Sequence, residues 1–209
     1  MEIYTLNVGQ GQFVVITGET EAIIVDTFIA LNPTNPIINV KGALADILKG
    51  KNLIGLVLTG FDADHFNEIG LKIMLNKYRP NWIMYPKYFK ETTNAKTCFG
   101  IIDSFDNQNI KFTRISVKIT NSTSRFYSKI SKDFDFEIFS PHPDDMDSSN
   151  NCSLVCKIIE RDRAAALRRV VARSALSLQR SAVPPGTWRG GRGARRLPGR
   201  AAEVLWGEK

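Results

Sequence analysis

Three side chains that can bind a divalent cation lie within four residues of one another, just after an apolar segment. The segment, residues 53–58, is typical of a buried strand, and Asp62, Asp64 and His65 follow it. Carboxylate oxygen and imidazole nitrogen both suit Zn²⁺ or Mn²⁺. The same residues are also typical of a polar turn, because Asp is common where a strand ends. The spacing therefore indicates either a metal site or an ordinary turn.

A third acidic residue, Asp26, comes at the end of another apolar segment. Residues 2–8 alternate as a half-buried strand does, and residues 13–16 and 22–27 predict two further strands. Asp26 lies at the end of the third of these strands. We expect two strands that end in acidic groups to converge on one rim of a sheet.

Four short segments together resemble the metallo-β-lactamase-fold hydrolases, in particular the soluble domain of ComEC-type DNA-uptake proteins. They are Asn-Val-Gly-Gln-Gly-Gln at 7–12, Ile-Val-Asp-Thr at 24–27, Thr-Gly-Phe-Asp-Ala-Asp-His at 59–65 and Asn-Cys-Ser-Leu-Val at 151–155. The likeness covers about residues 1–160. It implies an α/β fold of the αββα sandwich type, with a metal site at one edge of the two sheets. It also implies one or two Zn or Mn ions that activate a hydrolytic water.

The resemblance assigns roles to residues by their position in the motifs. Asp62 would be a ligand of a first metal site. Asp64 and His65 would be ligands of a second site, or the pair that orients the water. Asp26, together with Thr59, would support the metal loop from behind, as groups that hold metal ligands in place usually do.

Other positions either support or depart from the family pattern. Gly9, Gln10 and Gly11 would form a loop near the site, where glycine lets the backbone pass closely without a Cβ clash. The family has His two residues before the position of Asp62, but this chain has Gly60, which cannot ligate. The later Thr-Gly-Asp turn and His-rich loop of the family are not found. We therefore expect one ion at most, weakly bound.

His142 is the only histidine besides His65. It could supply the missing imidazole to a metal. Alternatively, it is a residue of an exposed loop, since prolines flank it and acidic residues follow.

The chain has two compositions. Residues 1–160 carry 13 Lys and 3 Arg against 18 acidic residues, a net charge of −2, and they contain all 12 Phe and all 5 Tyr. Residues 161–209 carry 11 Arg and 1 Lys against 3 acidic residues, a net charge of +9. This predicts a partial domain over 1–160 and an unrelated tail that is not a domain, attached through a frameshift, insertion or fusion.

The tail itself allows two interpretations. Residues 164–179 predict a helix, and the Gly-, Arg- and Pro-rich remainder predicts disorder. The run Gly-Gly-Arg-Gly at 190–193 is either an RNA-binding segment or part of an accidental basic tail. In both cases we expect weak, non-specific contact with nucleic acid.

Further helices are expected over residues 41–50, 66–76 and 97–105, and further strands over 82–86, 110–119 and 134–139. Such a mixture indicates a layered α/β class. No apolar run approaches the length needed to cross a membrane, and the N-terminus has no basic-then-apolar signal. The three cysteines lack a metal-binding spacing, which favours a reducing, cytoplasmic setting.

Three functions remain open. The first is a metal-dependent hydrolase, of the phosphodiester or nucleic-acid type by resemblance, with a degraded site. The second is an inactive relative that binds a nucleotide, a nucleic acid or a partner protein. The third is a truncated product without independent function, whose exposed sheet faces would make it poorly soluble.

Overall fold

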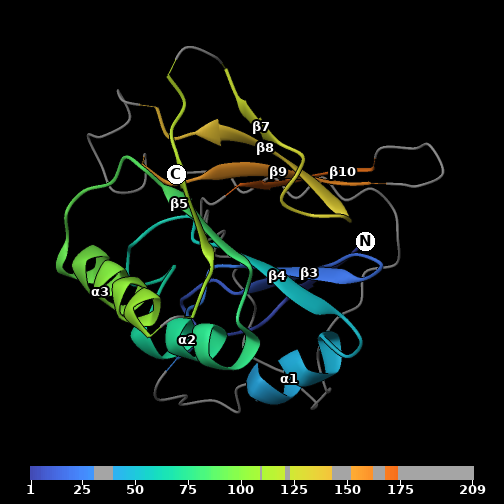
Figure 1. Ribbon diagram of the computed structural model, residues 1–209, viewed down its shortest axis with the longest axis horizontal. Helices are drawn as coiled ribbons and strands as arrows, with labels where there is room; N and C mark the ends of the chain where they lie inside the picture. The colour runs from blue at the N-terminus through green and yellow to red at the C-terminus, as the bar shows by residue number, and fades with distance from the viewer. Residues whose placement is uncertain (31–39, 109, 121–122, 143–151, 162–167, 174–209) are drawn as a thin grey trace, which may run out of the picture.

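The computed structural model describes residues 1–30, 40–108, 110–120, 123–142, 152–161 and 168–173. Two β-sheets face each other, and helices cover the outer face of the larger sheet (Figure 1). The protein is therefore a layered, mixed α/β fold, as the sequence predicts. No helix in the described ranges is long and apolar enough to cross a membrane.

The larger sheet has six strands in chain order. They are β1 (Glu2–Thr5), β2 (Val14–Thr17), β3 (Glu21–Val25), β4 (Asn52–Val57), β5 (Trp82–Pro86) and β6 (Thr113–Val117). The first three strands are antiparallel, whereas β3 to β6 are parallel and are joined through helices. Because parallel strands all end at the same edge, the residues that follow β3, β4 and β5 meet there.

The helices all pack on one face of this sheet. They are α1 (Val40–Ile47), α2 (Glu68–Ile73), which continues as the π-helical turn η1 (Met74–Tyr78), and α3 (Thr93–Asn107). Asn67 and Thr92 cap α2 and α3, because their side chains accept from the backbone N–H groups of Gly70 and Ala95. The buried core under the helices includes Leu44, Leu71 and Ile102.

The second sheet is antiparallel and has four strands. They are β7 (Arg125–Tyr127), β8 (Phe134–Ser140), β9 (Val155–Glu160) and β10 (Arg168–Arg173). Burial alternates along β8, so Phe134, Phe136 and Ile138 face the larger sheet. The ring of Phe136 meets that of Trp82 edge to face at 5.4 Å between centroids. The two sheets therefore share one apolar core.

The strand β10 corrects the expected helix over residues 164–179. Residues 168–173 pair with β9 as an antiparallel strand, whereas the rest of that range lies outside the described residues. Propensity favours a helix here, but the edge of β9 offers backbone partners that a sequence window cannot reveal. The disorder expected over the remainder of the tail, including 190–193, also falls outside the described residues.

Two buried carboxylates join the sheets at the edge where β3 and β4 begin. Asp133 Oδ2 accepts from the backbone N–H groups of Thr20 and Glu21, at 2.6 and 2.8 Å. In return, Glu21 Oε2 accepts from Ser131 Oγ at 2.6 Å and from the N–H of Lys132 at 2.7 Å. This reciprocal arrangement ties the turn before β3 to the turn before β8.

Candidate metal centre

The candidate site is built where β3 and β4 end. Asp26 follows β3 directly, and its N–H donates to the carbonyl of Val57 at 2.8 Å. Its backbone is left-handed, with φ of 59°, which few non-glycine residues adopt. Such strain is found mainly where the surrounding structure fixes a functional side chain. Here it accompanies a carboxylate that is fully buried.

Asp26, Thr59 and His65 form one buried hydrogen-bonded cluster. Asp26 Oδ1 accepts from the N–H of Thr59 at 2.8 Å, and Oδ2 accepts from Thr59 Oγ1 at 2.5 Å. The same Oδ2 lies 3.0 Å from Nδ1 of His65, which in turn lies 2.9 Å from Thr59 Oγ1. Because a carboxylate can only accept, Nδ1 of His65 carries the proton. The Nε2 atom is therefore the nitrogen left for another partner.

His65 is held in a strongly anionic setting. Burial lowers the pKa of its imidazole, but the charge and hydrogen bond of Asp26 and the charges of Asp64 and Asp62 more than offset this. The pKa is thereby raised from 6.5 to about 9. In the absence of a metal the imidazole is thus protonated at neutral pH, and a cation that binds Nε2 must displace a proton.

The loop that carries the candidate ligands is anchored from four sides. The β1–β2 connection, the end of β3, helix α3 and the segment before β9 each contribute one hydrogen bond to it. These bonds are Gln12 N–H to Asp64 O (2.8 Å), Thr27 N–H to His65 O (2.9 Å), Asn94 Nδ2 to Phe61 O (2.7 Å) and Leu154 N–H to Thr59 O (2.7 Å). Both sheets therefore help to position this loop.

The other two expected ligands lie on this loop but are less confined. Asp64 Oδ1 lies 3.8 Å from His65 Nε2, and the Asp64 side chain is 41% exposed. Asp62 is half-buried, and its backbone carbonyl accepts from the N–H of His65 at 3.1 Å. Among the described residues, no three His, Cys, Asp or Glu side chains gather as a ligand set. The structure brings Asp64 and His65 together but does not place Asp62 with them as a third ligand.

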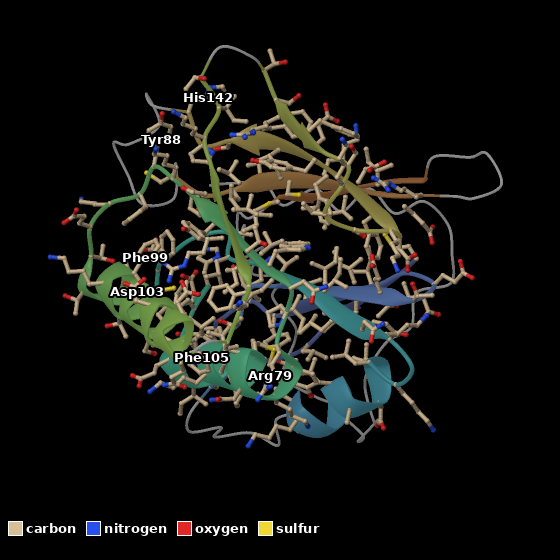
Figure 2. All side chains as sticks on the ribbon, viewed as in Figure 1. Arg79, Tyr88, Phe99, Asp103, Phe105 and His142 are labelled. Atoms are coloured by element: carbon tan, nitrogen blue, oxygen red, sulfur yellow. The ribbon has the colours of Figure 1, made fainter. Side chains whose placement is uncertain are left out.

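His142 does not complete the ligand set in the described part of the chain. It is half-buried and follows Pro141, whose carbonyl accepts from the N–H of Ile119 at 3.1 Å. Figure 2 shows His142 beyond the second sheet, at the end of the molecule away from Arg79.

Gly60 packs close to Ser153 and to the imidazole of His65. A Cβ atom at Gly60 would lie 3.3 Å from Ser153 Oγ and 3.4 Å from His65 Cδ2. A hollow of about 10 Å³ is lined by residues that include Gly60, Asp62, Lys90 and Cys152. That volume suits about one water molecule. This hollow, beside Gly60 and Asp62, is therefore too small for a substrate.

The glycines of the expected site loop have different roles. A Cβ at Gly11 would lie 2.0 Å from Cδ1 of Phe28, so close packing requires glycine there. At Gly9 the nearest atom would be 3.9 Å away, and the expected close approach is wrong for this residue. Glycine is favoured at position 9 for another reason, because its φ of 88° is one that residues with a Cβ rarely adopt. Gln10 is exposed in the same loop.

Two buried polar residues beside the site escape sequence reasoning. Gln12 and Thr27 each donate a backbone N–H to the ligand loop, yet Gln12 Oε1 and Thr27 Oγ1 have no hydrogen-bond partner in the described part of the chain. Their sequence positions could have indicated this role, because Gln12 directly follows the Gly-Gln-Gly run and Thr27 directly follows Asp26. Unpaired buried oxygens are uncommon, and a catalytic role, a bound water or a bound ion can each account for one.

Among the described residues, the donors close to one another are Nε2 of His65 and Oδ1 of Asp64, which can serve one cation and not two. One imidazole nitrogen with a fixed tautomer and one nearby carboxylate suit Zn²⁺ or Mn²⁺. A second ion would need the donor that Gly60 lacks.

Comparison with models of known protein families gives no match, and no characterised protein sequence matches the chain. A function for this chain therefore rests on the geometry of the cluster around His65.

Proposed function

We propose that residues 1–160 form a metallo-β-lactamase-like domain, derived from metal-dependent hydrolases of the phosphodiester or nucleic-acid type. Two observations support this proposal. Two sheets face each other with helices outside the larger one, and the candidate site lies at the ends of parallel strands. The observation that carries it is the buried pairing of Asp26 with Nδ1 of His65, which leaves Nε2 beside the Asp64 carboxylate.

The residues of this chain would hold one ion through Asp64 and His65, with Asp62 available from the same loop. Asp26 and Thr59 would fix the tautomer and orientation of His65. A bound Zn²⁺ or Mn²⁺ would supply Lewis-acid chemistry and a water of lowered pKa. Because two protein ligands hold a metal ion only weakly, hydrolysis by this chain should be slow.

The experiment is hydrolysis of bis(4-nitrophenyl) phosphate by the purified full chain, with Mn²⁺ or Zn²⁺ added. We expect slow hydrolysis that requires the metal and is lost in Asp64→Ala. Equal rates for the two proteins would contradict an enzymatic role.

A second candidate is an inactive relative that binds a nucleotide, a nucleic acid or a partner protein. Gly60 and the water-sized hollow beside it favour this alternative. The third interpretation, a poorly soluble truncated product, predicts exposed inner faces of the sheets, unpaired strand edges and apolar patches. In the described residues the inner faces of the two sheets instead pack on each other in one apolar core.

A further inference from the structure

An open cavity of about 550 Å³ lies at the edge of the larger sheet opposite to the candidate metal centre. Its lining includes Glu21 and Asn52, the first residues of β3 and β4, and Asn81, which precedes β5. Asp26, in contrast, follows β3 at its other end. The volume falls within the usual range of small-molecule sites.

The lining of this cavity is rich in cationic side chains, which are Lys51, Lys77, Arg79 and Lys132. Glu21 is the one acidic residue among the described residues of the lining. Its Oε2 atom already accepts from Ser131 Oγ and from the backbone of Lys132. The four cations form no ion pair with a described residue. Lys51 Nζ donates to the carbonyls of Gly18 and Glu19, both at 2.6 Å, and these groups carry no negative charge. The cavity therefore has unneutralised positive charge.

This charge is not a consequence of overall composition. Residues 1–160 have a net charge of −2, so four cations around one cavity are a local concentration. A cavity that concentrates one sign of charge attracts ligands of the opposite sign.

The backbone at Arg79 adds a second argument. The turn η1 ends at Arg79, whose φ of 49° is left-handed and would favour glycine. Figure 2 shows Arg79 at the end of the molecule away from His142. π-helical turns occur frequently at functional sites. An arginine at a position that prefers glycine indicates a use for the guanidinium.

We propose that this cavity binds the phosphate groups of a small, nucleotide-sized ligand. Arginine and lysine together provide the charge-assisted hydrogen bonds that phosphate oxygens accept. Lys77 lies over the ring of Tyr78, with Nζ 5.1 Å from the ring centroid. Tyr78, with Leu48 and Leu53, gives the lining an apolar part that suits a base. This site does not depend on the proposed metal centre.

The test is calorimetric titration of the full chain with ADP, pyrophosphate and adenosine as probes. The double variant Lys77→Gln, Lys132→Gln should bind ADP about tenfold more weakly, because each exposed charge pair contributes modestly. Arg79→Gly should also weaken ADP binding, yet leave the melting temperature unchanged or raised, because glycine relieves the left-handed backbone. If Arg79 had only a structural role, Arg79→Gly would not weaken ADP binding while the melting temperature stayed the same or rose.

The matched control is Lys111→Gln, Lys118→Gln, which removes the same charge from exposed positions that do not line the cavity. ADP binding should be unaffected in this control. Equal weakening in both double variants would overturn the proposal, because it would indicate general electrostatic attraction, including that of the basic tail. Failure of ADP to bind, or equal binding of adenosine, would also overturn it. If a short single-stranded oligonucleotide bound more tightly than ADP, and the same variants lost that binding, the ligand of this cavity would be a nucleic acid and not a small molecule.

Discussion

Nδ1 of His65 lies 3.0 Å from Oδ2 of Asp26, and this contact joins the loop after β4 to the end of β3. The two residues are 39 positions apart in the sequence, and both are buried. The carboxylate keeps the proton of the neutral imidazole on Nδ1 and raises the pKa of the ring. The protonation and metal affinity of His65 should therefore both depend on Asp26.

The stability of the metal-free protein should depend on pH through His65. The pKa of the ring is about 9 in the folded chain, against an ordinary imidazole value of 6.5. Protonation of His65 therefore makes its full contribution to the stability of the fold below pH 6.5, and this contribution is lost as the pH rises through 9. The shift corresponds to about 3 kcal/mol. Urea unfolding between pH 6 and 10, with EDTA present, measures the free energy of unfolding.

The control for this pH dependence is a single variant. His65→Gln should flatten the curve between pH 6.5 and 9. Because the chain has 2 His, an NMR titration can assign both rings directly. An imidazole of His65 that titrates near 6.5 in the folded protein would contradict the role given to Asp26.

Introducing a histidine at Gly60 should strengthen metal binding. The new Cβ would lie 3.4 Å from His65 Cδ2 and 3.3 Å from Ser153 Oγ, so small shifts of Ser153 are needed to accept it. A third protein ligand should raise Zn²⁺ affinity by about tenfold or more. Gly60→Ala is the matched control, since it adds the Cβ without a donor. Competition with a chromogenic chelator measures affinity, and equal values for the two variants would show that the imidazole does not reach the ion.

Two glycine-to-alanine changes should have opposite effects on stability. At Gly70, in α2, a Cβ would lie 1.7 Å from the carbonyl oxygen of Thr27, so Gly70→Ala should destabilise the fold by about 2 kcal/mol or more. At Gly100, exposed in α3, a Cβ would meet no atom within 4 Å. Gly100→Ala should therefore stabilise by about 0.5–1 kcal/mol through helix propensity. Chemical denaturation compares the two variants, and similar effects would contradict the packing of α2 against Thr27.

Asp133 should contribute far more to stability than a surface carboxylate. Its Oδ2 accepts from two backbone N–H groups in a buried setting, and Asp133→Ala would leave both unpaired. We expect a loss of about 2–4 kcal/mol. Asp103, whose side chain is 59% exposed and pairs with Arg114, is the control, with an expected loss below about 1 kcal/mol. Equal losses in thermal unfolding would show that Asp133 does not join the sheets.

Much of the larger sheet could be predicted because its pattern is local. The strand β5 spans residues 82–86 as predicted, since a run of large apolar residues bounded by polar turns leaves few alternatives. The strand expected over 110–119 is β6, which spans Thr113–Val117 and ends with Val117 in the core. The convergence of Asp26 and His65 followed from strand ends that share one edge.

The features that the sequence did not reveal depend on contacts between distant segments. β7 has three residues and no clear period, and β10 is a strand because β9 offers it an edge. The cavity near Arg79 combines side chains from four separate segments, none of which contains a motif. Nothing in the local pattern around Glu21 indicates that it exchanges hydrogen bonds with the turn before β8.

The most direct test of the central claim is the metal content of the purified full chain after incubation with Zn²⁺ or Mn²⁺. The matched protein is the double variant Asp64→Ala, His65→Ala. We predict about one ion per chain in the parent protein and a clear loss in the double variant, because these residues hold Nε2 and Oδ1 3.8 Å apart. No ion in either protein, or the same content in both, would contradict a metal centre at this loop.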